Sequence, residues 1–108
     1  MGTNKNKSQK IISIGRLSIN CDSRRVHIRD EEIKLANKEF ELLAFIASNP
    51  NIVFSKDTLL DRIWGEESFG DTSTVTVHIN RIREKIELDT SNPKYIETIW
   101  GAGYRFNL

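Results

Sequence analysis

The chain has 108 residues, of which 38% are hydrophobic and 29% are charged, and its formal net charge at pH 7 is +1. This length supports one domain with a single core, and the composition is too apolar for a disordered chain. No stretch approaches the roughly 20 apolar residues that cross a bilayer, and no signal-peptide pattern opens the chain. The single cysteine, Cys21, cannot form an internal disulfide, so we expect a reducing cytoplasm.

The charge is divided unevenly along the chain. Residues 1–54 carry nine Lys or Arg and six Asp or Glu, whereas residues 55–108 carry seven and nine. A protein that coats nucleic acid through bulk charge would be far more basic. If this chain binds DNA, we expect it to do so through a few well-placed contacts.

The first half of the sequence predicts a linker and then a small sheet. Residues 1–10 are polar and offer nothing to a core, so we predict a linker or a remnant of cloning there and one domain over 11–108. From Ile11 to Leu35, four short apolar runs alternate with turn or charged residues: IISIG, LSINC, RVHIR and EIKL. This pattern predicts four antiparallel strands in a meander.

The hydrophobic period then changes to that of a helix. Apolar residues spaced three and four apart predict a helix from Asn37 to Ser48, ended by Asn49–Pro50. A short extended segment, Ile52–Phe54, leads to Ser55, which is a good N-cap for a second helix through about Trp64. Residues 65–71 (GEESFGD) follow as a loop with three acids, two glycines and an aromatic residue.

Residues 71–87 (DTSTVTVHINRIREKIE) predict a third helix with one apolar stripe. The stripe has helical spacing at Val75, Ile79, Ile82 and Ile86. The opposite face carries Ser73, Val77, Asn80 and Glu84, flanked by Thr76 and Arg81. Short polar groups, one arginine and one methyl-bearing residue suit base edges in a DNA major groove. By periodicity alone, a plain solvated amphipathic helix is an equal alternative.

The chain ends in two predicted strands, Tyr95–Ile99 and Tyr104–Phe106. The four residues between them, WGAG, contain two glycines that permit a tight hairpin with positive φ. The order of elements predicts an α+β fold: a winged helix-turn-helix with an N-terminal four-stranded antiparallel sheet, three helices and a C-terminal β-hairpin wing.

Three stretches carry a family resemblance: NKEFELLAFIASNPNIVFSKDTLLDRIWG, TVTVHINRIREKIE and NPKYIETIWGAGYRF. From about Ile11 to Phe106, the chain resembles the C-terminal winged-helix DNA-binding effector domain of OmpR/PhoB-type response regulators. In that family a histidine kinase phosphorylates an N-terminal receiver domain, and the effector domain binds promoter DNA to control transcription. The resemblance implies a bacterial cytoplasmic protein of a two-component phosphorelay, whose receiver domain is absent from this chain.

The resemblance also implies roles for individual residues. The third helix would lie in the major groove, with base contacts from Thr76, Val77 and Arg81. Phosphates of the DNA backbone would be held by Lys56, Trp64, Thr74, His78, Asn80, Arg83 and Tyr104. The tip of the wing would consist of Trp100, Gly101 and Gly103. In activators, RNA polymerase would be approached by the loop that contains Glu66, Glu67 and Phe69.

The chain departs from the family pattern at some of these positions. Relatives often have arginine where this chain has Ser73 and Asn80, and aspartate where it has Thr76. Trp100 stands where some relatives insert an arginine into the minor groove, and an indole cannot donate the same set of hydrogen bonds. The base preference at residue 76 and the minor-groove contact of the wing are therefore left open.

Other positions have alternative structural interpretations. At the first helix, Ala36 occupies the usual threonine position, so either Asn37 caps the helix or its start is weaker by about 1 kcal/mol. His78 lies at the edge of the apolar stripe, where packing and a phosphate contact are both plausible. Trp64 suits a core or interface position, with its N–H available to a phosphate.

We expect no cofactor, no metal and no catalytic residue. The two histidines, His27 and His78, lie in separate predicted elements, and no Cys–His cluster, glycine-rich phosphate loop or nucleophile motif is present. The alternative to DNA binding is a winged-helix module for protein–protein interaction, which the near-neutral charge favours. The resemblance further implies direct-repeat binding sites, a monomeric isolated domain, and a full-length dimer when phosphorylated.

Overall fold

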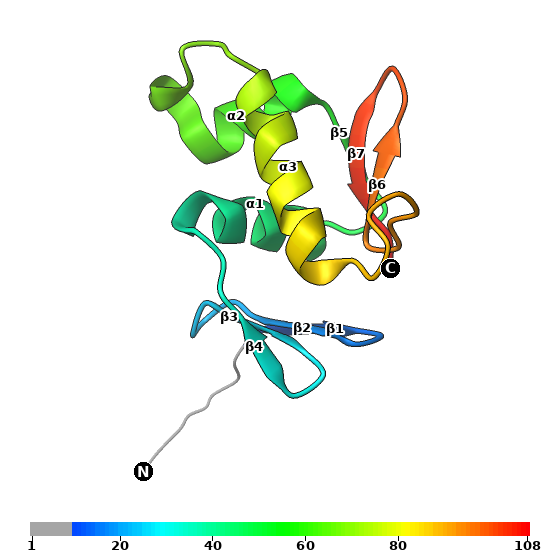
Figure 1. Ribbon diagram of the computed structural model, residues 1–108. Helices are drawn as coiled ribbons and strands as arrows, with labels where there is room; N and C mark the ends of the chain where they lie inside the picture. Colours follow the sequence, from blue (N-terminus) through cyan, green and yellow to red (C-terminus); the bar gives the residue numbers. More distant parts are fainter. Residues whose placement is uncertain (1–9) are drawn as a thin grey trace. The chain divides into compact units, whose positions relative to one another are not determined.

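The computed structural model describes residues 10–108, and the chain divides between Lys34 and Leu35 into two compact units. The predicted linker, residues 1–10, lies outside the described residues except for Lys10. Figure 1 labels the α-helices and the strands of both units. Each unit is described by itself below.

The N-terminal unit is a four-stranded antiparallel sheet. Its strands are β1 (Ile11–Ile14), β2 (Leu17–Asn20), β3 (Arg25–Ile28) and β4 (Glu31–Ile33), in the spatial order β1-β2-β3-β4. One row across the sheet is wholly aliphatic and consists of Ile12, Ile19, Val26 and Ile33. Because side chains alternate between the two faces of a strand, this row defines the apolar face, on which Leu17, Ile19 and Val26 are buried. The predicted meander is confirmed.

The second unit begins with α1 (Asn37–Ser48), which has the predicted bounds. The N-cap residue is Ala36 and not Asn37. Because the methyl group of Ala36 cannot accept a hydrogen bond, the helix start has no side-chain cap. One half of a capping box is nevertheless present, because the N–H of Ala36 donates to Oε1 of Glu39 at 3.0 Å. Glu39 is itself buried and receives a 2.8 Å hydrogen bond from Nζ of Lys85. Although burial raises the pKa of Glu39, the bonds from Lys85 and Ala36 outweigh it and hold this pKa below its usual value.

The second helix, α2 (Lys56–Trp64), also has the predicted bounds. Oγ of Ser55 accepts the backbone N–H of Thr58 at 3.0 Å, which satisfies one of the free donors of the first turn. The predicted loop at residues 65–71 is more ordered than expected, since Gly65–Ser68 forms a short 3₁₀ helix, η1.

The third helix, α3 (Ser73–Ile86), lies over α1 and α2 and contacts both (Figure 1). The predicted apolar stripe is confirmed, because Val75, Ile79, Ile82 and Ile86 are all at most 2% exposed. The helix starts on an acidic side chain outside it: Oδ1 of Asp71 accepts the N–H of Ser73 at 3.0 Å and its hydroxyl at 2.5 Å. These two bonds lower the pKa of Asp71 and occupy the Ser73 hydroxyl.

The wing belongs to a sheet of three strands, where the sequence predicted a two-stranded hairpin. Its strands are β5 (Val53–Phe54), β6 (Ile96–Ile99) and β7 (Gly103–Phe106), in the order β5-β7-β6. The extended segment before α2 therefore pairs with the wing. A Cβ atom placed on Gly103 would lie 1.9 Å from the carbonyl oxygen of Phe54, so the close approach of β5 requires glycine at this position.

The α+β winged-helix fold predicted from the sequence is present: three helices, a four-stranded antiparallel sheet and a C-terminal wing. Among the helices formed by residues 10–108, none has the length and apolar character that a membrane span requires.

Candidate nucleic-acid interface

The outward face of α3 carries the side chains predicted to meet DNA bases. Val77, Asn80 and Arg81 are exposed, and Val77 retains 43% of its accessible surface. Thr76 is half-buried on the same side of the helix. This face therefore presents one guanidinium, one amide, one hydroxyl and one branched apolar group, which are the chemical types that read base edges in a major groove.

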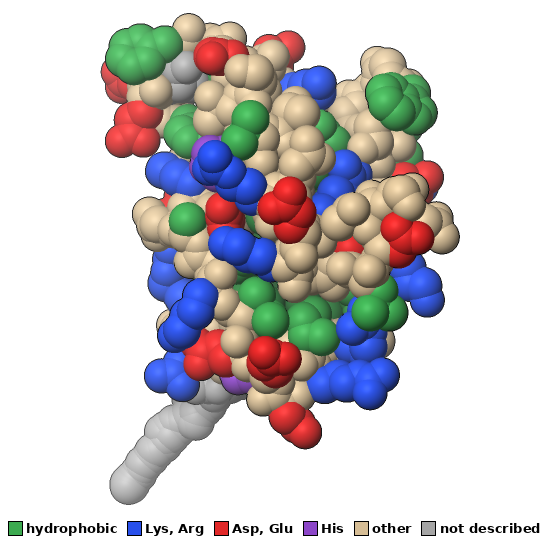
Figure 2. Space-filling model, viewed as in Figure 1, with side chains coloured by type: hydrophobic (Ala, Val, Ile, Leu, Met, Phe, Trp, Pro, Cys, Tyr) green, Lys and Arg blue, Asp and Glu red, His purple; other side chains and the backbone are tan. Residues whose placement is uncertain are grey.

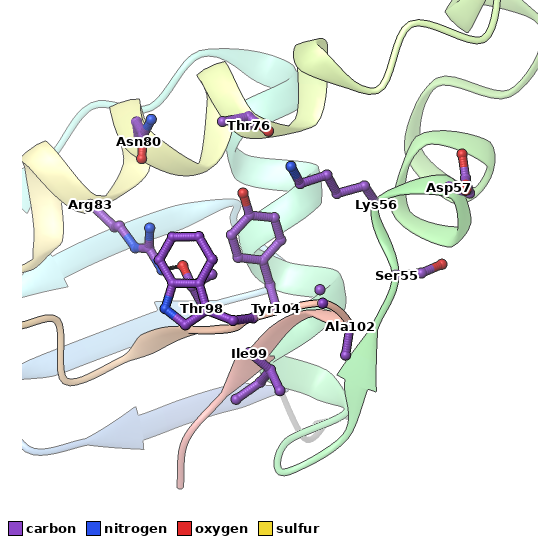
Figure 3. Close-up of a pocket in the computed structure, with 13 residues that line it drawn as sticks. Ser55, Lys56, Asp57, Thr76, Asn80, Arg83, Thr98, Ile99, Ala102 and Tyr104 are labelled. Atoms are coloured by element: carbon purple, nitrogen blue, oxygen red, sulfur yellow. Dashed lines mark hydrogen bonds between the residues drawn. The ribbon is translucent and has the colours of Figure 1, made fainter.

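A hollow of about 560 Å³ is lined by residues of α3, the wing and the start of α2. Its walls include Lys56 and Ser55 from α2 and its cap, Thr76 and Asn80 from α3, and Thr98 and Tyr104 from the wing. In Figure 3 the side chains of Lys56 and Tyr104 point towards Thr76 across this space. Four predicted DNA-backbone contacts, Lys56, Asn80, Arg83 and Tyr104, thus line one hollow that is rich in hydrogen-bonding groups.

Two further predicted backbone contacts, Trp64 and His78, touch each other. Their rings meet edge to face, with centroids 4.8 Å apart. Nδ1 of His78 donates to the carbonyl oxygen of Thr74 at 2.8 Å, since a carbonyl can only accept. The histidine is half-buried and held from both sides, so packing determines its orientation.

Arg83 lines the same hollow but is largely buried. Only 9% of its surface is exposed, and its Nε and Nη2 atoms donate to the carbonyl oxygen of Ile96 at 3.1 and 2.8 Å. Nη2 also donates to the hydroxyl of Thr98 at 2.8 Å, and the guanidinium carbon lies 5.5 Å from the centroid of the Tyr104 ring. Burial lowers the pKa of Arg83. These contacts join α3 to the wing, which is a structural role that sequence reasoning missed.

The wing tip is open and apolar. Trp100 is 90% exposed, and the chain turns beside it through Gly101, which has a φ of 82°. The N–H of Ala102 closes the turn on the carbonyl oxygen of Ile99 at 2.9 Å. The positive φ predicted for both wing glycines is confirmed, since Gly103 has a φ of 145°.

The predicted polymerase loop also carries an exposed aromatic side chain. Phe69 is 95% exposed and has a left-handed backbone with a φ of 52°. Glu66 and Glu67 precede it and are exposed, and one oxygen of Glu67 lies 3.7 Å from Nζ of Lys38.

Over α3, the molecular surface has no continuous basic patch. Figure 2 shows neutral polar surface there, with isolated basic and acidic side chains. Any binding of nucleic acid at this face must therefore depend on individual contacts. No group of three or more His, Cys, Asp or Glu among residues 10–108 is arranged to hold a metal ion.

Sequence reasoning missed a second buried charge in addition to Arg83. The carboxylate of Glu87, just after α3, accepts the N–H groups of Lys94, Tyr95 and Ile96 at 2.7–3.2 Å. The sequence gives only a weak indication that Arg83 and Glu87 are buried, namely that each comes directly after a residue of the apolar stripe. Helical periodicity does not reveal a hydrogen-bond partner in a distant strand.

A sequence profile for the family described as "Transcriptional regulatory protein, C terminal" matches residues 30–106. The chain belongs to this family. The transcriptional regulatory protein YcbL of Bacillus subtilis is 44% identical to it over 96 residues, which cover 89% of this chain and 42% of that protein. The chain thus spans less than half the length of this curated relative.

Solved structures give the same assignment. DrrB, an OmpR/PhoB homologue from Thermotoga maritima, is 37% identical with a TM-score of 0.85, over 91% of this chain and 44% of that one. The DNA-binding domain of RstA from Klebsiella pneumoniae, solved in complex with the RstA box, is 31% identical with a TM-score of 0.82, over 91% of this chain and 97% of that one. The chain therefore belongs, as the sequence predicted, with the OmpR/PhoB-type DNA-binding effector domains of transcriptional regulatory proteins.

Proposed function

We propose that this effector domain recognises a specific promoter sequence by placing the outward face of α3 in the major groove. Arg81 would donate to a guanine edge, Thr76 would bond to a base, and Val77 would meet a thymine methyl group. The observation that supports this most directly is the exposure of Val77, Asn80 and Arg81 on a helix whose opposite face is wholly buried.

The backbone contacts would lie on both sides of that helix. Lys56, Asn80 and Tyr104 line the hollow beside α3, which has room for a phosphate group and offers a cation, an amide and a hydroxyl. Trp64 and Thr74 would serve the other side through the indole N–H and the threonine hydroxyl. Since Nδ1–H of His78 is already bonded to the Thr74 carbonyl, His78 would join them only with a second proton, on Nε2. The predicted phosphate contact of Arg83 is not part of this proposal, because its Nε and Nη2 atoms are already bonded within the protein.

The experiment that tests this proposal begins with selection of bound duplexes from a random-sequence DNA pool. The recovered duplex is then titrated with the chain between roughly 50 and 200 mM salt. We expect a recurrent sequence motif, an affinity on the order of micromolar, and a steep loss of affinity with salt, because each phosphate contact releases counterions. Lys56→Met should make the salt dependence shallower by about one phosphate contact, without changing the selected motif. Recovery of no motif, or a flat salt response, would favour a protein-interaction module instead.

We also propose that the segment around Phe69 contacts RNA polymerase when the regulator activates transcription. A benzyl side chain that is 95% exposed beside two glutamates suits a protein partner better than solvent. Phe69→Ser should lower transcription from a dependent promoter while leaving DNA affinity unchanged. An equal loss in both assays would argue against this contact.

The chain would operate as part of a longer regulator. The remaining length of its relatives leaves room for a receiver domain that a histidine kinase phosphorylates, with dimerisation on direct repeats of the binding site. The isolated chain would then be a monomer. Sedimentation of the isolated chain with a single half-site should give one protein per duplex.

A further inference from the structure

The C-terminal end of α3 bears two charged residues that are buried and face the wing. Arg83 is 9% exposed, and Glu87, at the C-cap, is 8% exposed. They lie one helical turn apart, and the N–H of Glu87 bonds to the carbonyl oxygen of Arg83 at 2.9 Å. Burial of charged groups is costly unless hydrogen bonds satisfy them, so their partners reveal what they do.

Glu87 holds the entry to strand β6. Its Oε1 accepts from the N–H of Lys94 at 2.7 Å, and its Oε2 accepts from the N–H groups of Tyr95 and Ile96, both at 2.9 Å. Three successive backbone amides thus converge on one carboxylate. This arrangement fixes the path of the chain as it leaves the turn after α3 and enters the wing.

Arg83 bonds to the same strand through the carbonyl group of Ile96. Its guanidinium donates twice to the carbonyl oxygen of Ile96 and once to the hydroxyl of Thr98, two residues further along β6. Figure 3 shows Arg83 of α3 beside Thr98 of the wing. Ile96 is therefore bonded through its N–H to Glu87 and through its carbonyl to Arg83, and its side chain is fully buried.

We propose that Arg83 and Glu87 form a clamp on the backbone N–H and carbonyl of Ile96, and that this clamp sets the wing at a fixed position relative to α3. The inference rests on the proposed function, because its consequence appears in DNA binding. With the clamp closed, α3 and the wing tip meet the duplex as one preorganised unit, and no free energy is spent on ordering the wing during binding. Arg83 is then a positioning residue, which acts through Trp100 at the tip instead of touching a phosphate.

The first test separates positioning from charge. Arg83→Lys keeps the positive charge but cannot reproduce the planar set of donors that reaches both Ile96 and Thr98. We expect this variant to bind the selected duplex about tenfold more weakly, the equivalent of one lost charged hydrogen bond, with the same salt dependence as the parent chain. A phosphate contact predicts the opposite result: near-parental affinity for Arg83→Lys, and for Arg83→Met a slope of log affinity against log salt that is smaller by about 0.9.

The second test asks whether the effect passes through the wing. Affinities of the parent chain, Arg83→Lys, Trp100→Ala and the double variant are measured on a duplex of about 20 base pairs recovered by selection, which is two helical turns. If the clamp positions the tip, removal of Trp100 costs little once the clamp is broken. The double variant should then bind about fivefold more tightly than the product of the two single losses predicts.

Lys85→Gln provides the matched control. Lys85 is also a basic residue in the second half of α3, but its partner is Glu39 in α1 and not the wing. Its loss and that of Trp100→Ala should multiply independently. Thermal unfolding of every variant checks that the domain is folded, and if Arg83→Lys does not fold, Thr98→Val removes a single acceptor of the clamp and takes its place in the cycle.

The outcomes are distinguishable. Independent losses in the Arg83–Trp100 cycle, or an unchanged affinity of Trp100→Ala, would overturn the clamp as a positioning device while leaving DNA binding intact. Failure of the parent chain to select any duplex would instead overturn the proposed function.

Discussion

Arg81 and Arg83 are two positions apart in the same helix and have opposite surroundings. They project about 200° apart around α3, because successive residues turn by about 100°. Arg81 is exposed on the outward face, whereas Arg83 is buried against the wing and donates three hydrogen bonds to backbone and hydroxyl oxygens. The comparison shows that charge alone does not identify a DNA contact in this domain, since one arginine is available to a ligand and the other holds the binding surface together.

A similar contrast exists between the two wing glycines, one with free space beside it and one crowded by a neighbouring strand. We expect the largest effect on stability there. Gly103→Val should lower the free energy of unfolding by about 4 kcal/mol or prevent folding, because its Cβ would collide with the Phe54 carbonyl and separate β5 from β7. Gly101→Ala is the control: nothing lies within 4 Å of the added Cβ, so only the positive φ is penalised, by about 1 kcal/mol. Equal denaturation midpoints for both variants would contradict the three-stranded sheet.

The next effect should separate the two arginines by stability. Arg83→Met should lower the free energy of unfolding by about 3 kcal/mol, because it leaves the carbonyl of Ile96 and the buried Glu87 without their cationic neighbour. Arg81→Met should change it by no more than about 0.5 kcal/mol, as is usual for exposed positions. Urea denaturation of the two variants measures both values, and similar losses would remove the distinction drawn above.

The third effect should separate them by specificity. Arg81→Ala should reduce discrimination between the selected duplex and single-base variants by about 1–3 kcal/mol at one position, because a forked contact to guanine is lost. Its melting temperature should stay close to that of the parent chain. Competition binding against a panel of single-base variants is the measurement, and an unaltered preference at every position would exclude Arg81 from base readout.

The smallest effect concerns the buried carboxylate of Glu39 and its partner Lys85, on the side of α3 that faces α1. The pKa of Glu39 is lowered in the folded state, so its ionised form contributes stability that is fully present above the unfolded pKa. That contribution is lost as the pH falls through the lowered folded value. Denaturation midpoints measured from pH 6 down to pH 3 should therefore fall, and Lys85→Met should make the fall smaller because it removes the hydrogen bond that lowers this pKa. A steeper fall in the variant would contradict this assignment.

Several features could be predicted from the sequence because they depend on neighbours within a few residues. The bounds of α1 and α2, the Ser55 cap and the buried stripe of α3 all follow from local spacing and capping chemistry. The four strands of the N-terminal sheet were equally predictable, since short apolar runs alternate there with turn residues. The outward position of Arg81 and Val77 required only the helical period.

Other features were decided by tertiary structure. The third strand of the wing sheet arises because Val53 and Phe54 pair with Arg105 and Tyr104, about fifty residues away in the chain. The 3₁₀ helix η1 could not be predicted, because its sequence has no apolar residues at helical spacing.

The sequence by itself determined the order of the elements, the family and the face of α3 that stays open, because hydrophobic periodicity and turn chemistry act over short distances along the chain. Only the folded structure decided that Arg83 and Glu87 belong to the interior. Whether a charged side chain is buried depends on the donors and acceptors that the fold brings beside it. Ile96 and Thr98 supply the acceptors for Arg83 from 13 and 15 positions away, and the donors to Glu87 lie 7 to 9 positions away.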